Sequence, residues 1–131
     1  MNMDEPGQTS APRPVVLMVD DEHQLLETMR LGLAGEFDLD LAATAEEAEL
    51  MMATRRYDIV VSDHLMPGEV GLDFLIRARA RHPGTKRILI TGYMNPELIM
   101  RSVNVAELSA CLVKPVRAAK VAEAIRAALA K

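Results

Sequence analysis

The sequence predicts an α/β fold in which a doubly wound parallel sheet of five strands is covered by helices on both faces. Short apolar runs alternate five times with segments of helical periodicity along the 131 residues. Strands separated by helices of roughly 10–15 residues are joined by right-handed crossovers, which makes the strands parallel. All strands of such a sheet end at the same edge, so the residues that follow the strands are expected to meet there.

The first strand and helix are predicted from a change in period. Residues 15–19 are apolar without a break, as a strand covered on both faces requires. Residues 22–34 then repeat apolar side chains every four residues from Leu25 to Leu33, which is typical of an amphipathic helix. Gly35 follows as a helix stop.

The second strand and helix follow a different pattern. Residues 37–41 alternate apolar and acidic side chains, which indicates a strand near the edge of the sheet with one face wet. Its aspartates, Asp38 and Asp40, are expected to be only solvated. Residues 44–47 match a capping box that opens a helix reaching about residue 56.

The second half of the chain repeats the strand–helix unit three times. Its predicted strands comprise residues 59–62, 87–91 and 110–113, and its predicted helices comprise about residues 72–82, 95–104 and 118–130. The fourth of the five helices has the clearest start: Asn95 is an N-cap residue, Pro96 suits the first turn, and Glu97 is favoured there by the helix dipole.

Composition and charge limit the class of protein. A length of 131 residues fits one domain, predicted to span residues 15–131 after a disordered N-terminal tail, residues 1–14, that contains three prolines. A net charge of −4 without a basic run argues against direct nucleic-acid binding. One cysteine fits a reducing compartment, and the sequence contains neither a signal peptide nor an apolar run of about 20 residues. We therefore expect a cytoplasmic protein without a membrane span.

Polar residues follow four of the five predicted strands. Asp20 and Asp21 follow the first strand, Asp63 the third, Thr91 ends the fourth, and Lys114 follows the fifth. In a parallel sheet these side chains converge at the carboxyl edge, where ligands bind in open α/β folds. Asp63 is the centre of the group, because its buried strand ends on this acid and breaks at a Pro-Gly turn.

The grouped charges indicate phosphoryl transfer. Two like charges about 4 Å apart repel by about 4 kcal/mol at an effective dielectric of 20, so three carboxylates need cations beside them. Lys114 is one cation, and a divalent metal with hard oxygen ligands, Mg²⁺ or Mn²⁺, is the other. A carboxylate can serve as the nucleophile that forms an aspartyl phosphate. A Thr hydroxyl and a Lys ammonium are the donors that a bound phosphoryl group needs.

These motifs, taken together and in order, resemble the receiver domains of two-component response regulators over residues 15–131. The matching pieces are Asp20-Asp21, the Asp-x-x-Met-Pro-Gly stretch that starts at Asp63, Thr91-Gly92 and Lys114-Pro115. The resemblance implies a flavodoxin-like (βα)5 sandwich with strand order 2-1-3-4-5. It also implies a phosphoprotein that works in phosphorelay signal transduction and whose phosphoryl donor is a sensor histidine kinase or a phosphotransfer protein.

The resemblance assigns a role to each residue at the predicted edge. Asp63 is implied to be the phosphoacceptor and, with Asp21, a direct Mg²⁺ ligand, while Asp20 supports the metal through water. The backbone carbonyl of Leu65 is implied as a further ligand. Thr91 and Lys114 are implied to bind the phosphoryl oxygens, with a cis peptide bond before Pro115.

The switch residues depart from the family pattern. Thr91 usually couples to an aromatic residue three positions before the lysine, and here that position is Cys111. Tyr93 is expected either to take over part of this coupling or only to cover the site. Leu65 and Tyr93 occupy positions that influence phosphoryl lifetime in the family, and we expect them to restrict water and slow autodephosphorylation.

Three interpretations follow from the sequence. The first is a signalling switch that catalyses only its own phosphorylation and dephosphorylation, with a possible homodimer through the last strand and its flanking helices. The second is a pseudo-receiver, a binding module that phosphate does not regulate, which the cysteine at position 111 keeps open. The third is a phosphatase with an Asp nucleophile, which Leu65 disfavours because such enzymes usually carry a second acid there.

Overall fold

The computed structural model describes residues 12–66, 68–92 and 95–131. Strands and helices alternate along them as predicted. The elements are β1 (Val15–Val19), α1 (His23–Leu33), β2 (Asp38–Ala42), α2 (Ala45–Thr54), β3 (Ile59–Asp63), α3 (Gly71–Arg81), β4 (Lys86–Thr91), α4 (Pro96–Ala106), β5 (Ala110–Val113) and α5 (Ala118–Leu129).

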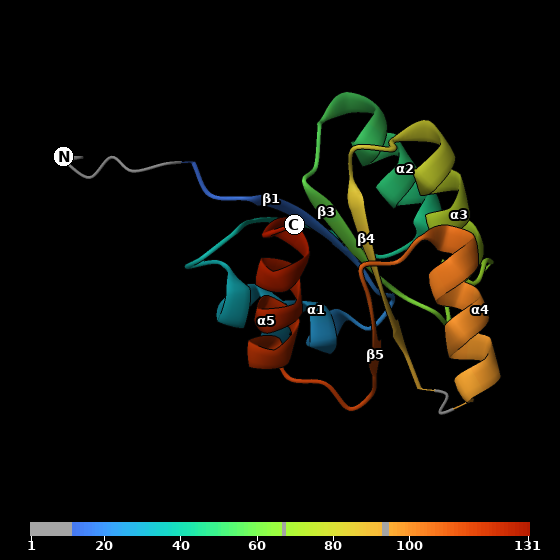
Figure 1. Ribbon diagram of the computed structural model, residues 1–131. Coiled ribbons are helices and arrows are strands. Elements are labelled where there is room, and N and C mark those ends of the chain that lie inside the picture. Colours follow the sequence, from blue (N-terminus) through green and yellow to red (C-terminus); the bar gives the residue numbers. More distant parts are fainter. Residues whose placement is uncertain (1–11, 67, 93–94) are drawn as a thin grey trace, which may run out of the picture.

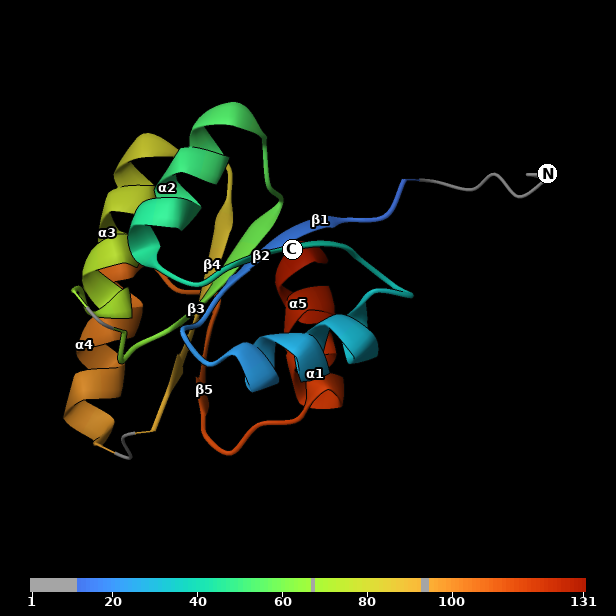
Figure 2. The same ribbon diagram turned by 180° about the vertical axis from the view of Figure 1, so that it is seen from behind.

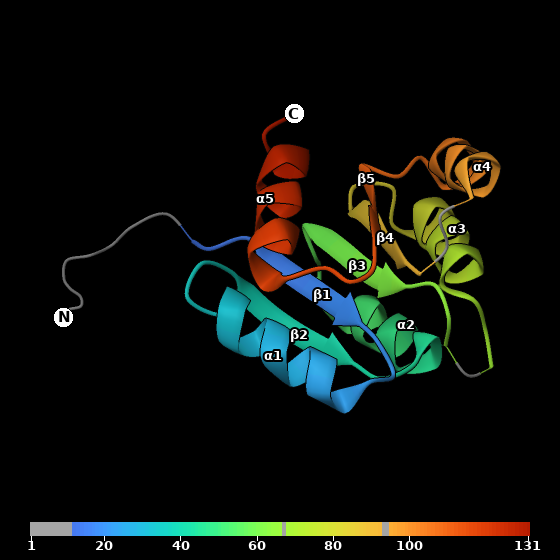
Figure 3. The same ribbon diagram turned by 90° about the horizontal axis from the view of Figure 1, so that it is seen from below.

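The five strands form one parallel sheet in the order β2-β1-β3-β4-β5, so the predicted fold class and strand order are confirmed. Figure 3 shows β2, β1 and β3 side by side with their arrowheads toward the same edge. β1 and β3 occupy the middle of the sheet, and β2 lies at its edge, as its alternating pattern predicted.

Helices α1 and α5 cover one face of the sheet, and α2, α3 and α4 cover the other (Figures 1 and 2). Successive side chains of a strand point to opposite faces. Leu17 and Val19 of β1 therefore pack with Phe74 of α3, whereas Val16 and Met18 pack with residues of α1 and α5 such as Ile125. The unbroken apolar runs of the sequence are needed because both faces are buried.

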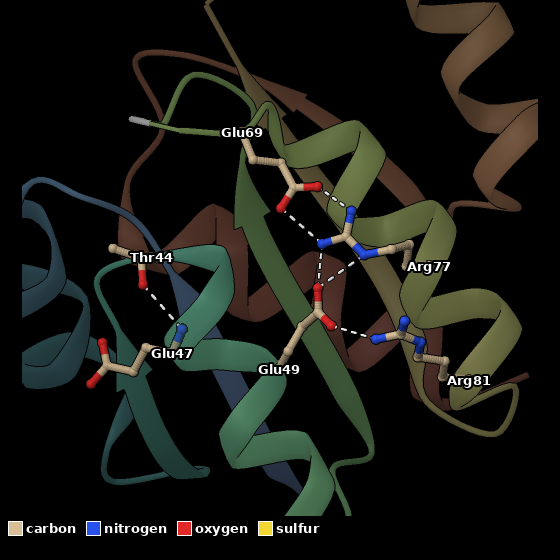
Figure 4. Close-up of polar contacts among 6 residues, drawn as sticks. All are labelled: Thr44, Glu47, Glu49, Glu69, Arg77 and Arg81. Carbon is tan, nitrogen blue, oxygen red and sulfur yellow. Dashed lines mark hydrogen bonds and ion pairs between the residues drawn. The ribbon is translucent and has the colours of Figure 1, made fainter.

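The predicted helix starts at α2 and α4 are confirmed. At α2, the backbone N–H of Glu47 donates to Thr44 Oγ1 at 3.0 Å (Figure 4), and Glu47 Oε1 accepts from the N–H of Ala43 at 2.8 Å. At α4, Asn95 Oδ1 accepts from the N–H of Glu97 at 2.9 Å. The bonds from the N–H groups of Glu47 and Glu97 satisfy backbone donors that a helix leaves free at its first turn, and the bond from Ala43 holds the residue that precedes the N-cap.

The prediction that Asp38 and Asp40 are only solvated is wrong. Arg55, which follows α2, donates to Asp38 at 2.6 Å and to Asp40 at 2.7 Å, and the Tyr57 hydroxyl donates to Asp40 at 2.7 Å. Burial of the phenol together with its bond to Asp40 raises the pKa of Tyr57. The cluster forms because α2 returns the chain alongside the edge strand, which residue alternation within that strand does not reveal.

Two residues of the predicted tail contact the folded domain. Arg13 Nη1 donates to the carbonyl of Ala34 at 2.7 Å, at the end of α1, and the N–H of Asp38 donates to the carbonyl of Pro14 at 2.9 Å. Residues 1–11 of the tail lie outside the described residues. Within the described ranges, every helix is too short or too polar to cross a lipid bilayer.

Candidate functional site

The sheet brings the predicted acids together at its carboxyl edge. Val19 of β1 is paired with Ser62 of β3, so Asp20 and Asp63 follow at the same level on neighbouring strands. Asp20, Asp21 and Asp63 each offer a carboxylate oxygen, and these oxygens lie within 4.8 Å of one another. The side chains of Asp20 and Asp63 are almost completely buried.

Lys114 brings an ammonium group to the acids from β5. Its Nζ lies 2.9 Å from Asp63 Oδ1, 3.9 Å from Asp20 Oδ2 and 3.7 Å from Glu22 Oε1. Its backbone N–H donates to the carbonyl of Thr91 at 2.8 Å, which extends the β4–β5 pairing to the strand ends. The Lys114–Pro115 peptide bond is cis, as the resemblance implied.

Burial shapes the electrostatics of this cluster. Desolvation raises the pKa of Asp20 from 3.8 to about 6, although the N–H of Glu22 donates to its Oδ1 at 2.9 Å and favours the ionised form. Desolvation also raises the pKa of Asp63, and the hydrogen bond from Lys114 opposes this rise without cancelling it. Burial lowers the pKa of Lys114, but the hydrogen bond to Asp63 and the negative charges of Asp63, Asp20 and Glu22 together outweigh this effect and leave the pKa above its usual value. The site therefore contains more negative charge than one ammonium group balances.

The donor set fits a magnesium ion. The three aspartates supply hard carboxylate oxygens, which Mg²⁺ prefers over the imidazole and thiolate ligands typical of zinc. A divalent cation would also offset the charge that Lys114 leaves unbalanced. Mg²⁺ usually keeps several waters and accepts phosphate oxygens in their place, so this edge of the sheet suits a phosphoryl group.

Gly71 determines how closely α3 approaches Asp63, and the sequence analysis missed it. A Cβ on Gly71 would lie 2.0 Å from the carbonyl oxygen of Asp63 and 2.9 Å from Ser62 Oγ. Ser62 Oγ itself donates to the Asp63 carbonyl at 2.9 Å. A glycine at the start of a helix, where it has poor propensity, was the signal that could have revealed this close approach.

The other predicted residues lie around this cluster. Thr91 is buried and is the last residue of β4, one position beyond the partner of Asp63 in the strand register. Leu65 follows β3 and is 52% exposed. Tyr93 lies outside the described residues. Cys111 of β5 is partly buried against the α2–α4 face, and burial raises the pKa of its thiol.

Comparison with known proteins identifies the family. The family described as "Response regulator receiver domain" matches residues 16–126, and the chain belongs to it. The chain is 34% identical over 106 residues to the hydrogenase transcriptional regulatory protein HoxA of Cupriavidus necator, and 29% identical over 119 residues to the response regulator protein PilR of Pseudomonas aeruginosa. These alignments cover 81% and 89% of the chain but only 22% and 26% of the relatives.

A solved structure agrees with this assignment. The signal receiver domain of an HD domain-containing protein from Pseudomonas fluorescens Pf-5 is 31% identical, with a TM-score of 0.84 over 95% of this chain and 92% of that chain. The chain is thus a receiver domain homologous to those of two-component response regulators, spanning about a quarter of its curated relatives. Receiver domains are signalling modules that generally lack enzymatic activity, bind Mg²⁺ through acidic residues and interact with histidine kinases or phosphotransfer proteins.

Proposed function

We propose that Asp63 accepts a phosphoryl group from a phosphohistidine of a sensor kinase or phosphotransfer protein in a Mg²⁺-dependent reaction. The observation that carries the proposal is the 2.9 Å contact between Lys114 Nζ and Asp63 Oδ1, beside carboxylates grouped within 4.8 Å. Asp21, Asp63 and the backbone carbonyl of Leu65 would bind the ion directly, and Asp20 would act through water.

The proposed chemistry is an in-line displacement. An oxygen of Asp63 bonds to phosphorus while the phosphorus–nitrogen bond of the donor breaks, and the histidine nitrogen leaves with the electron pair of that bond. The bound metal supplies charge neutralisation on the phosphoryl oxygens. Lys114 already touches Asp63, so its ammonium can donate to a phosphoryl oxygen as the bond forms. Thr91, at the end of the neighbouring strand, contributes a hydroxyl donor.

Phosphorylation would change the surface that other molecules bind. The aspartyl phosphate adds about −1.5 to −2 charges at the carboxyl edge, next to the ends of β4 and β5. Movement of Thr91 and Lys114 toward the new charge would alter β5, α4 and α5 and so change the binding of a partner or of a second copy. In the family, an aromatic residue on β5 usually couples the movement of the threonine to the surface. Cys111 has no ring, so Thr91 has no aromatic residue on β5 for this coupling.

The chain would promote only its own phosphorylation and dephosphorylation, in the cytoplasm, and would not contact nucleic acid directly. Incubation with Mg²⁺ and acetyl phosphate, followed by intact mass measurement, tests whether Asp63 is phosphorylated and whether the reaction requires the metal. We expect one phosphoryl adduct that is lost in Asp63→Asn and in the presence of a metal chelator. Asp73→Asn is the matched control, because Asp73 is an exposed aspartate in the first turn of α3.

Three other outcomes of this experiment would contradict the proposal. No adduct at any Mg²⁺ concentration would identify a pseudo-receiver that binds its partners without phosphate. An adduct that persists in Asp63→Asn would place the acceptor elsewhere. Repeated turnover of a small phosphate ester would identify a phosphatase instead of a signalling switch.

A further inference from the structure

The connection between β3 and α3 continues directly from Asp63. Backbone hydrogen bonds hold its ends: the N–H of His64 donates to the carbonyl of Ile90 at 2.8 Å, and the N–H of Gly71 donates to the carbonyl of His64 at 2.7 Å. Between these ends, Met66 is buried and Gly68 has a φ of 84°. These bonds join the start of α3 to the residue that directly follows Asp63.

Glu69 in this connection is bound by Arg77 of α3 (Figure 4). Arg77 Nη2 donates to Glu69 Oε1 at 2.8 Å, and Arg77 Nη1 donates to Glu69 Oε2. A bidentate arginine–carboxylate pair fixes orientation as well as distance. Arg77 also holds the pKa of Glu69 below its usual value, which is the direction expected when a guanidinium donates to the ionised carboxylate.

Arg77 is itself held from a second side by Glu49 of α2. Arg77 Nε donates to Glu49 Oε2 at 3.0 Å, and Arg81 Nη1 donates to Glu49 Oε1 at 2.6 Å (Figure 4). The side chains of Arg77, Glu49 and Glu69 are 35%, 27% and 26% exposed. Arg77 therefore joins the β3–α3 connection to α3 through Glu69, and joins α3 to α2 through Glu49.

This arrangement differs from an ordinary surface ion pair. An exposed pair contributes little because water screens it and two mobile side chains must be ordered. Arg77 makes bidentate contact, is shared between two carboxylates and is about two-thirds shielded from water, so its guanidinium is already ordered by α2 when it binds Glu69. A lysine ammonium is a single nitrogen and cannot reproduce the planar, bidentate contact that the guanidinium makes with Glu69.

We propose that Arg77 is a positioning residue for the phosphoryl-accepting site. By binding Glu69 it holds the β3–α3 connection, and with it the Leu65 backbone, in the position that the Mg²⁺ and phosphoryl chemistry of Asp63 requires. This inference rests on the proposed function. It goes further by assigning a role to an ion-pair network that lies outside the cluster of strand-end acids.

The main test compares Arg77→Met with wild type over a series of Mg²⁺ concentrations, with acetyl phosphate as donor. Mutation of a residue that holds a metal ligand in position typically lowers metal affinity by about 10- to 100-fold. We expect the Mg²⁺ concentration for half-maximal phosphorylation to rise about tenfold, with a smaller change in the rate at saturating Mg²⁺. Glu69→Gln should give the same effect, and the double variant should be no worse than either single variant.

Arg81→Met is the matched control, since it removes an arginine–Glu49 pair of the same helix without touching Glu69. It should phosphorylate like wild type, whereas Arg77→Lys should recover only part of the lost Mg²⁺ affinity. Urea unfolding of each variant shows whether the chain remains folded.

Hydrogen–deuterium exchange in Mg²⁺-free buffer gives a second readout that does not depend on phosphorylation. Amides of the peptide covering residues 64–71 should exchange several times faster in Arg77→Met than in wild type. In Arg81→Met they should exchange at the wild-type rate. Equal exchange and equal Mg²⁺ dependence in the two variants would overturn the positioning role while the proposed function stands. A wild-type chain that gains no phosphoryl group would refute the proposed function and this inference together.

Discussion

Gly71→Ala should damage both the fold and the acceptor site, because the new methyl group would overlap the backbone of Asp63. The Cβ would lie 2.0 Å from the Asp63 carbonyl oxygen, and real Cβ atoms essentially never approach another atom within 3.0 Å. Either the start of α3 or the end of β3 must therefore move by about 1 Å. The obstacle is backbone on a central strand, so no side-chain rotation can relieve the overlap.

The size of the effect follows from that displacement. Overpacking a well-packed site typically costs about 1–3 kcal/mol, and a rigid obstacle places Gly71→Ala near the upper end, about 2–3 kcal/mol. For a domain of this size the melting temperature should fall by roughly 10 °C. A misplacement of about 1 Å can slow a reaction by about 100-fold, so phosphorylation by acetyl phosphate should slow by roughly 10- to 100-fold.

Two glycines provide controls for thermal unfolding and for phosphorylation followed by intact mass. A Cβ on Gly35 would have no atom within 4 Å, so Gly35→Ala should retain both stability and rate. A Cβ on Gly32 would lie 2.5 Å from Ala118 Cβ, between α1 and α5 on the other face of the sheet. Gly32→Ala should lose stability and still phosphorylate at the wild-type rate while folded. Wild-type stability in Gly71→Ala, or an equal loss of rate in Gly32→Ala, would refute this reasoning.

Three further predictions concern stability and phosphoryl lifetime. Arg87, buried in β4, donates to the carbonyls of Ala106 and Glu107 at the end of α4, so Arg87→Met should lower the free energy of unfolding by about 2–4 kcal/mol in urea titrations. In metal-free buffer, stability should fall as pH rises from about 4 to about 6, because folded Asp20, with its pKa raised to about 6, binds its proton more tightly than the unfolded carboxyl group at 3.8. Asp20→Asn should reduce this fall by at most about 3 kcal/mol, and the part that remains is due to Asp63, whose pKa burial also raises. A pH-independent urea midpoint in wild type would contradict the prediction. Leu65→Asn should shorten the half-life of the phosphoryl adduct roughly tenfold. An amide side chain can hold a water molecule by about one hydrogen bond, which leucine cannot do. An unchanged half-life would show that residue 65 does not control water access.

Local patterns were sufficient for the fold because each element carries its own signal. The unbroken run of β1 requires burial on both faces, and five strand–helix repeats allow only a parallel sheet. Since parallel strands end at one edge, the order of the motifs also predicted that Asp20, Asp63 and Lys114 would meet, and the distances among them agree. Their chemical roles remain predictions that the phosphorylation experiment tests.

Side-chain contacts between elements far apart in the sequence could not be predicted from local patterns. Asp38 and Asp40 were expected to be solvated, but Arg55 reaches them from a position 17 and 15 residues away because α2 packs against β2. Arg77 binds Glu49 across 28 residues for an equivalent reason. Long flexible side chains can choose among many partners, and only the packing of helices on the sheet selects one.

The sequence by itself determined the order of the strands and helices and the carboxyl edge as the site of Asp63, since apolar periodicity and strand direction are local properties. Tertiary structure alone decided that α3 begins against the Asp63 carbonyl, where only glycine fits, and that Arg77 ties the following connection to α2. Both features depend on the distance between packed elements, to which no residue pattern along the chain is sensitive. They surround the acid that the sequence had already singled out, and they determine how firmly it is held.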